Sequence, residues 1–245
     1  MINKLFCLML GFAICLVCIP NPNVRAYEFT FNEDGGDVIG TVRYKGVVPE
    51  IAHLKVDRNS EFCGPSVSDE SLMVNHENGG IKNVVVSIEN VTSGKRHEPA
   101  TITIDNFKCQ FIPRIQAGMI GDLYELKNSD PIIHNTLFHL ENDDDIIISV
   151  ALPPFVNPIK RPIMANEGII HVKCNAHPFM HANILVFKHP YFATTDENGS
   201  FEISNIPPGH YKVKIWHETL PVQESELKII SHQRTILNLS LSAKN

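Results

Sequence analysis

A thiol, an imidazole and a thioether lie within one run of seven residues, Cys174-Asn175-Ala176-His177-Pro178-Phe179-Met180. A cysteine sulfur and two histidine nitrogens, with a methionine sulfur at longer range, are ligands with which proteins hold redox-active copper. This run contains one histidine, so a copper site built on it needs a second histidine from another loop.

A second histidine follows a predicted turn 40 residues before Cys174. The alternating residues 123–126 indicate a strand, residues 128–131 indicate a turn, and His134 follows that turn. The intervening chain is long enough for strands that bring the two loops together at one end of a sandwich. Taken alone, the later run could equally be a buried cysteine, a hydrogen-bonded histidine and a core methionine. The added His134 favours a metal site.

The strands that must position these residues are short. No sustained helical stripe of apolar residues occurs after residue 26, whereas alternating or β-branched runs recur. They predict strands at residues 38–44, 83–88, 101–104, 146–150, 169–172 and 184–187. Turn pairs such as Asn198-Gly199 separate the runs. We therefore expect an all-β protein built from sandwiches.

Two turns near the C-terminus, at residues 195–201 and 207–211, flank one predicted strand. This arrangement resembles the second half of the carboxypeptidase regulatory-like (transthyretin-like) sandwich. Strands suited to its first half lie far upstream, so we expect a small discontinuous sandwich interrupted by another domain. Two domains in plain succession are the alternative. The expected domains are residues 27–96 together with 189–245, and residues 97–188 between them.

The interrupting segment carries four short motifs in a set order. They are Phe111-Ile112-Pro113, Asn128-Ser129-Asp130, His134-Asn135 and the run from Cys174 to Met180. This order resembles the cupredoxins, and the C-x2-H-x2-M spacing is similar to that of the amicyanins among them. The resemblance implies a Greek-key sandwich that holds one type 1 copper ion.

The same resemblance assigns roles to individual residues. It implies that His134, Cys174 and His177 are the equatorial copper ligands and that Met180 is the distant axial ligand. It also implies that the backbone N–H of Asn135, beside the first ligand, points at the cysteine sulfur and that its side chain ties the two loops together. Pro178 has no N–H, so it can offer the cysteine sulfur no hydrogen bond.

Residues 1–26 have the form of a secretory signal. Lys4 precedes an apolar run from Leu5 to Ile19, and small residues surround Arg25 up to Ala26, where we expect cleavage. The apolar run is too short to span a bilayer as a helix, which needs about 20 residues. We therefore expect a secreted or periplasmic protein with no membrane span after cleavage.

Three cysteines remain after residue 26: Cys63, Cys109 and Cys174. An odd number in an oxidising compartment suggests one disulfide and one thiol kept for chemistry. A bound metal would protect Cys174 from oxidation, so we expect a Cys63–Cys109 disulfide. Two free buried thiols are the alternative.

The expected function is electron transfer. A formal net charge of -6 argues against nucleic-acid binding. No nucleophile motif or carboxylate pair stands out in the sequence, and it contains no His-x-His pair, so we do not expect an enzyme. An apolar surface around His177, Pro178 and Phe179 would dock a protein redox partner such as a cytochrome c or a dehydrogenase. The alternatives are an envelope interaction module, in which copper is structural or absent, and a copper delivery or resistance protein.

Overall fold

The structure is a computed structural model that describes residues 27–141, 146–164 and 167–243. Nearly all of its regular structure is β-strand, and the one helix in the described part is the single turn α1 (Ser60–Cys63). The predicted all-β fold is therefore confirmed. No helix among these residues is long and apolar enough to cross a membrane. The expected signal at residues 1–26 lies outside the described residues.

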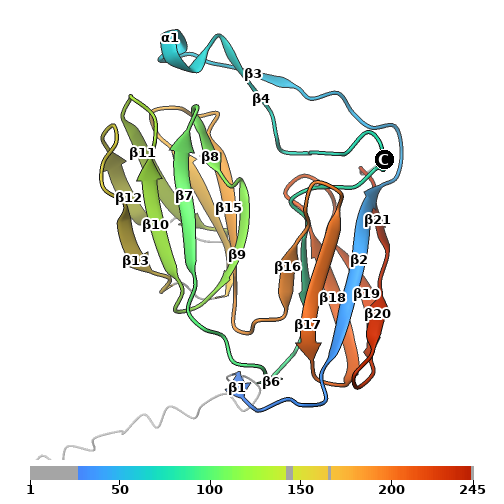
Figure 1. The fold of residues 1–245 in the computed structure, drawn as a ribbon. Coiled ribbons are helices and arrows are strands. Elements are labelled where there is room, and N and C mark those ends of the chain that lie inside the picture. Colours follow the sequence, from blue (N-terminus) through green and yellow to red (C-terminus); the bar gives the residue numbers. More distant parts are fainter. Residues whose placement is uncertain (1–26, 142–145, 165–166, 244–245) are drawn as a thin grey trace, which may run out of the picture.

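The first sandwich contains the middle of the chain (Figure 1). One sheet has the order β13 (Ile159–Pro162), β10 (Leu123–Asn128), β7 (Thr101–Phe107) and β8 (Gln110–Ile112). The other has the order β12 (Ile146–Leu152), β11 (His134–Leu140), β14 (Gly168–Cys174), β15 (His181–Phe187) and β9 (Ile115–Met119). Strand β14 returns to lie between β11 and β15, which is Greek-key connectivity.

Alternating burial along these strands forms the core of the first sandwich. In β10 every second residue is buried, because successive side chains of a strand point to opposite faces. Tyr124 and Phe138 meet edge to face across the two sheets, with ring centroids 4.8 Å apart. Antiparallel pairing places Thr136 opposite Cys174. The start of β11 and the end of β14 therefore lie at the same end of the sandwich.

The second sandwich is assembled from two separate stretches of chain. Its sheets have the orders β16 (Phe192–Thr194), β5 (Val85–Ile88), β18 (Gly209–Trp216), β19 (Gln223–Ile229), and β17 (Ser200–Ile206), β2 (Gly36–Tyr44), β20 (Arg234–Ile236), with β21 (Leu239–Leu241) also paired to β2. The early strands β2 and β5 share one hydrophobic core with the late strands. The sandwich is thus discontinuous, with the first sandwich inserted between its parts.

The predicted Asn198-Gly199 turn joins β16 to β17. Gly199 has a φ of +72°, and a Cβ atom there would lie 2.3 Å from the carbonyl oxygen of Val42. Only glycine fits this conformation and this close approach of backbones. A short parallel pair, β1 (Glu28–Phe29) with β6 (Ser93–Gly94), lies where the chain leaves the second sandwich (Figure 1).

Apolar and ionic contacts join the two sandwiches. A small buried cluster contains Ile115, Leu185 and Phe187 of the first sandwich with Val85 and Trp216 of the second. Beside it, Arg114 and Glu218 form a two-pronged ion pair, with Nε–Oε1 and Nη2–Oε2 distances of 2.6 and 3.1 Å. The guanidinium therefore neutralises a carboxylate that is largely withdrawn from water.

Between β2 and β5 the chain leaves the second sandwich and extends over the end of the first. We call residues 52–69 the arm; it contains β3 (His53–Lys55), α1 and β4 (Ser66–Ser68), and β3 pairs with β4. Figure 1 shows the arm above the ends of β7, β8 and β11. The predicted disulfide is present and joins Cys63 of the arm to Cys109 of the first sandwich. Cys174 is the free cysteine among the described residues.

Candidate metal centre

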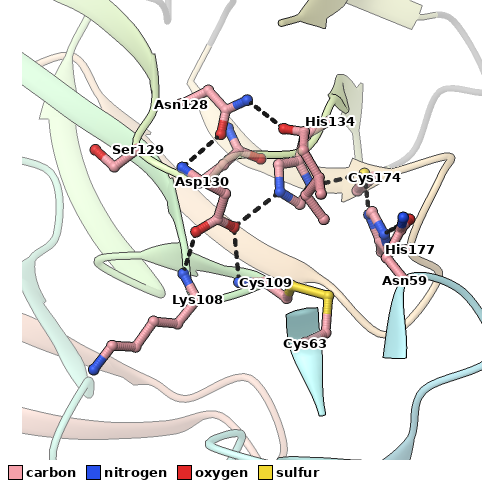
Figure 2. Close-up of polar contacts among 12 residues, drawn as sticks. Asn59, Cys63, Lys108, Cys109, Asn128, Ser129, Asp130, His134, Cys174 and His177 are labelled. Atoms are coloured by element: carbon pink, nitrogen blue, oxygen red, sulfur yellow. Dashed lines mark hydrogen bonds and ion pairs between the residues drawn. A yellow bond between two sulfur atoms is a disulfide. The ribbon is translucent and has the colours of Figure 1, made fainter. Parts of the chain in front are cut away.

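Three predicted ligands meet at the end of the first sandwich that lies beneath the arm (Figure 2). His134 begins β11, Cys174 ends β14, and His177 follows in the loop to β15. The Cys174 Sγ atom lies 3.9 Å from His134 Nδ1 and 3.7 Å from His177 Nδ1. All three side chains are buried. The strand pairing that aligns β11 with β14 therefore also aligns the donors.

These separations can be compared with those of a shared metal ion. Protein metal–nitrogen and metal–sulfur bonds are about 2.0 and 2.3 Å long. At trigonal angles, a sulfur and a nitrogen bound to one ion are then about 3.8 Å apart. The two sulfur–nitrogen distances in the structure match this value. The donor set, one thiolate and two imidazoles, is also the set that suits copper.

Both imidazoles are oriented by oxygen atoms on their far side. His134 Nε2 lies 2.9 Å from Asp130 Oδ2, and His177 Nε2 lies 3.0 Å from Asn59 Oδ1. Each Nε2–H donates to its oxygen, so each Nδ1 presents its lone pair toward Cys174. Burial lowers the pKa of both histidines, which keeps the rings neutral and able to bind a metal.

Asp130 connects the disulfide to the first ligand. Its carboxylate is buried and accepts the backbone N–H groups of Lys108 and Cys109, at 2.6 and 2.9 Å. Both of these residues have positive φ, 52° and 57°, as in a type I′ hairpin turn. The turn thus directs two N–H groups at the carboxylate, whose other contact is the His134 ring (Figure 2). Such a carboxylate fixes the orientation of a ligating histidine and raises its basicity.

The arm covers the second histidine. Asn59, which precedes α1, has a φ of +55°, a conformation that asparagine tolerates better than most residues. Its side chain reaches His177, whose ring is 0% exposed. The prediction that His177 forms part of an exposed docking surface with Pro178 and Phe179 is therefore wrong. Pro178 is exposed and Phe179 partly buried, but the arm closes the outer edge of the imidazole.

The remaining predicted site residues lie around these three donors. Met180 is buried in the core cluster that contains Cys174, and its N–H donates to the His177 carbonyl at 2.9 Å. The backbone of Asn135 ties the two loops, because its carbonyl accepts the N–H of Asn175 at 3.3 Å. Its buried side-chain oxygen has no hydrogen-bond partner within the described part of the chain.

Two functional residues, Asp130 and Asn59, were not assigned by sequence reasoning. Asp130 had a signal, because it closes the Asn128-Ser129-Asp130 turn four residues before His134. Asn59 had none, since 118 residues separate it from His177.

Comparisons with known proteins give partial matches. The family described as BOS complex subunit NOMO1-like, second beta sandwich domain, matches residues 189–242. No curated protein matches the chain. A copper-containing nitrite reductase (NirK) from Thermus scotoductus SA-01 aligns at 19% identity with a TM-score of 0.33, over 38% of this chain and 24% of that chain.

Two further solved structures are small cupredoxins. A mutant of amicyanin in its reduced Cu(I) form aligns at 18% identity with a TM-score of 0.32, over 42% of this chain and 98% of that chain. A purple cupredoxin from Nitrosopumilus maritimus aligns at 20% identity with a TM-score of 0.30, over 36% of this chain and 99% of that chain. These scores are low, so the assignment of the ligands rests on the geometry of the site.

Proposed function

We propose that this protein is an exported mononuclear type 1 copper protein that carries electrons between redox partners. The observation that carries the proposal is the arrangement of His134, Cys174 and His177, because both histidine nitrogens lie at the distance from the cysteine sulfur that one shared trigonal ion requires. Both imidazoles are already turned toward that position by Asp130 and Asn59.

The protein's part in this function is to keep the ligands in place. A copper ion held by one thiolate and two imidazoles would accept and release one electron. Cys174 and His134 are held by adjacent paired strands, and the turn closed by Met180 N–H and His177 C=O holds the third ligand. Met180, which is buried in the same core cluster as Cys174, would be the fourth ligand. Ligands that do not move between oxidation states lower the barrier to electron transfer.

The remaining parts of the proposal follow from the sequence. Residues 1–26 direct export, and the protein acts in the periplasm or outside the cell as a carrier and not as an enzyme. A cytochrome c or a dehydrogenase is the proposed class of partner. Ile133, directly before the first ligand, is 54% exposed and provides apolar surface near the site for such a partner.

Visible spectroscopy of the copper-loaded protein tests this function. The purified protein with Cu(II) should show intense thiolate-to-copper absorption that disappears on reduction. Cys174→Ser and His134→Gln should abolish it, because each removes a ligand. His171→Gln is the matched control, since His171 lies on β14 but bonds Asn183 outside the site. A colourless protein that binds only Cu(I) would support delivery instead, and one that binds no copper would leave an interaction module.

A further inference from the structure

We propose that the arm is a lid over the metal centre: Asn59 positions His177, and the Cys63–Cys109 disulfide is the latch that keeps the lid closed. This inference rests on the metal-binding role proposed above. It adds a second redox-sensitive element, one that controls access to the site and is separate from the ligands themselves.

The arm has little of its own to hold it in place. None of the residues of α1 is buried, and the β3–β4 pair spans three residues on each strand. Its polar contacts to the first sandwich within the described structure are the hydrogen bonds of Asn59 with His177 and of Gln110 with Ser68, and a 3.9 Å ion pair of Asp69 with Arg114. Val56 is the one buried apolar side chain among its described residues. Segments with few buried apolar contacts open at low free energy. The covalent bond from Cys63 to Cys109 is therefore the strongest attachment of the arm.

The Cys63–Cys109 disulfide lies next to the contacts that orient both histidines. On the arm side, Cys63 lies four residues after Asn59, which contacts His177. On the sandwich side, the N–H of Cys109 donates to Asp130, which contacts His134. Figure 2 shows the disulfide below the site, between these two contacts. Breaking the disulfide frees the arm on one side and leaves the Asp130 network intact on the other.

The chemistry of opening is thiol–disulfide exchange. A dithiol reductant supplies two electrons and two protons; it becomes a disulfide, and Cys63 and Cys109 become two thiols. The arm then lifts, Asn59 leaves His177, and the outer edge of the imidazole meets water. Oxidation of the two thiols by a disulfide of the same class restores the closed state.

Reactivity of Cys174 in the metal-free protein tests the lid without requiring copper. The full chain is treated with a small alkylating reagent under native conditions, and modification of Cys174 is followed by mass spectrometry of its peptide. The variant Cys63→Ser/Cys109→Ser should react about 10-fold faster than the wild type or more, because opening of the arm exposes the site. Val213→Ala is a control that weakens the core of the second sandwich without touching the arm, and it should react at the wild-type rate.

Variants of Asn59 distinguish opening of the arm from a general loss of stability, since they keep the disulfide. Asn59→Gly removes the oxygen and suits the positive φ, so it should raise the Cys174 rate several-fold. Asn59→Asp keeps an acceptor and should stay near the wild-type rate. Asn238→Gly, which removes an asparagine contact to Thr41 in the second sandwich, should have no effect.

Equal Cys174 rates in the wild type, the disulfide-free variant and Asn59→Gly would overturn the lid. If the Cys174 rates differ as expected but the Cu(II)-loaded protein shows no thiolate-to-copper absorption, the lid stands and the electron-transfer function is rejected. In a chain that does bind Cu(II), loss of copper to a chelator should follow the same order of variants as the Cys174 rates.

Discussion

The two sandwiches bury different kinds of residue. The first encloses many polar side chains: Asn106, Asp122, Asn128, Asp130, His134, Thr136, His177 and Asn183. The second encloses fewer, namely Ser87, His189, Thr195 and His217. The Thr195 hydroxyl accepts the N–H of Val84 and donates to the carbonyl of Ile81. Burying polar groups is unfavourable unless each finds a partner. The first sandwich thus carries groups that its stability alone does not require.

Most of these groups gather at one end of the first sandwich. Asn128 Nδ2 donates to the carbonyls of Ile132, Leu152 and Pro153, which fixes the loops beside the candidate ligands. The second sandwich presents no comparable group of donors in its described residues, yet the arm that covers the ligands belongs to it. The first sandwich therefore supplies the candidate ligands, and the second supplies the arm that covers them.

The largest expected effect on stability comes from removing one large side chain from the hydrophobic core of each sandwich. Phe138→Ala in the first sandwich and Phe201→Ala in the second should each lower the free energy of unfolding by about 3–5 kcal/mol. Only Phe138→Ala should also weaken metal binding, because Phe138 lies on β11, which begins at His134, and belongs to the core cluster that contains Cys174. Chemical denaturation and chelator competition measure the two quantities. An equal loss of metal affinity in both variants would contradict the division of roles.

The second prediction concerns the boundary between the sandwiches. His217 is buried, and burial together with the charge of Arg114 lowers its pKa to about 4. The unfolded chain takes up this proton near pH 6.5, whereas the native state does not until about pH 4. Stability from this group is therefore present above pH 6.5 and is lost as the pH falls toward 4, by about 3 kcal/mol.

His217→Gln should remove this part of the pH dependence, measured as the free energy of unfolding of the metal-free protein between pH 4 and 7. His210→Gln, at an exposed histidine of the same sandwich, is the control. An unchanged slope in His217→Gln would place the acid sensitivity elsewhere in the molecule.

The third prediction compares two buried aspartates of the first sandwich. Asp130→Asn should lower metal affinity by about 10- to 100-fold, because the charge that supports His134 is lost. Asp122→Asn makes the same change at the opposite end, where the carboxylate binds His97 and two backbone N–H groups. It should reduce stability and leave metal affinity unchanged. Chelator competition on both variants shows whether metal affinity depends on the aspartate beside His134 or on any buried aspartate of the sandwich.

The smallest effect is expected at the contact between the sandwiches. A double-mutant cycle with Arg114→Met and Glu218→Gln should give a coupling of about 1–2 kcal/mol, since the pair is only partly exposed. Urea denaturation followed by the fluorescence of Trp216, the single tryptophan of the chain, measures it. A coupling near zero would show that this ion pair adds no stability to the contact made by the apolar cluster.

Much of the fold could be predicted from local patterns. The six predicted strand segments overlap β2, β5, β7, β12, β14 and β15, because alternation and β-branching act between near neighbours. Sequence reasoning also singled out His134 and Cys174, which the structure brings together through one antiparallel pair. It read residues 45–82 as part of the second sandwich and missed the arm, whose short β3 and β4 have few apolar residues.

The amino-acid sequence alone was enough to predict the strand content and the types of donor available to a metal, and it favoured the pairing of Cys63 with Cys109 that the structure contains. Those properties depend on residue chemistry and on spacing along the chain. The tertiary structure alone decided that His177 is closed off by Asn59 and that Asp130 supports His134. The first contact joins residues 118 positions apart, and the second depends on how a neighbouring hairpin turn aims its N–H groups. The local sequence places Asp130 near His134, but it encodes neither the direction of that carboxylate nor the contact of Asn59 with His177.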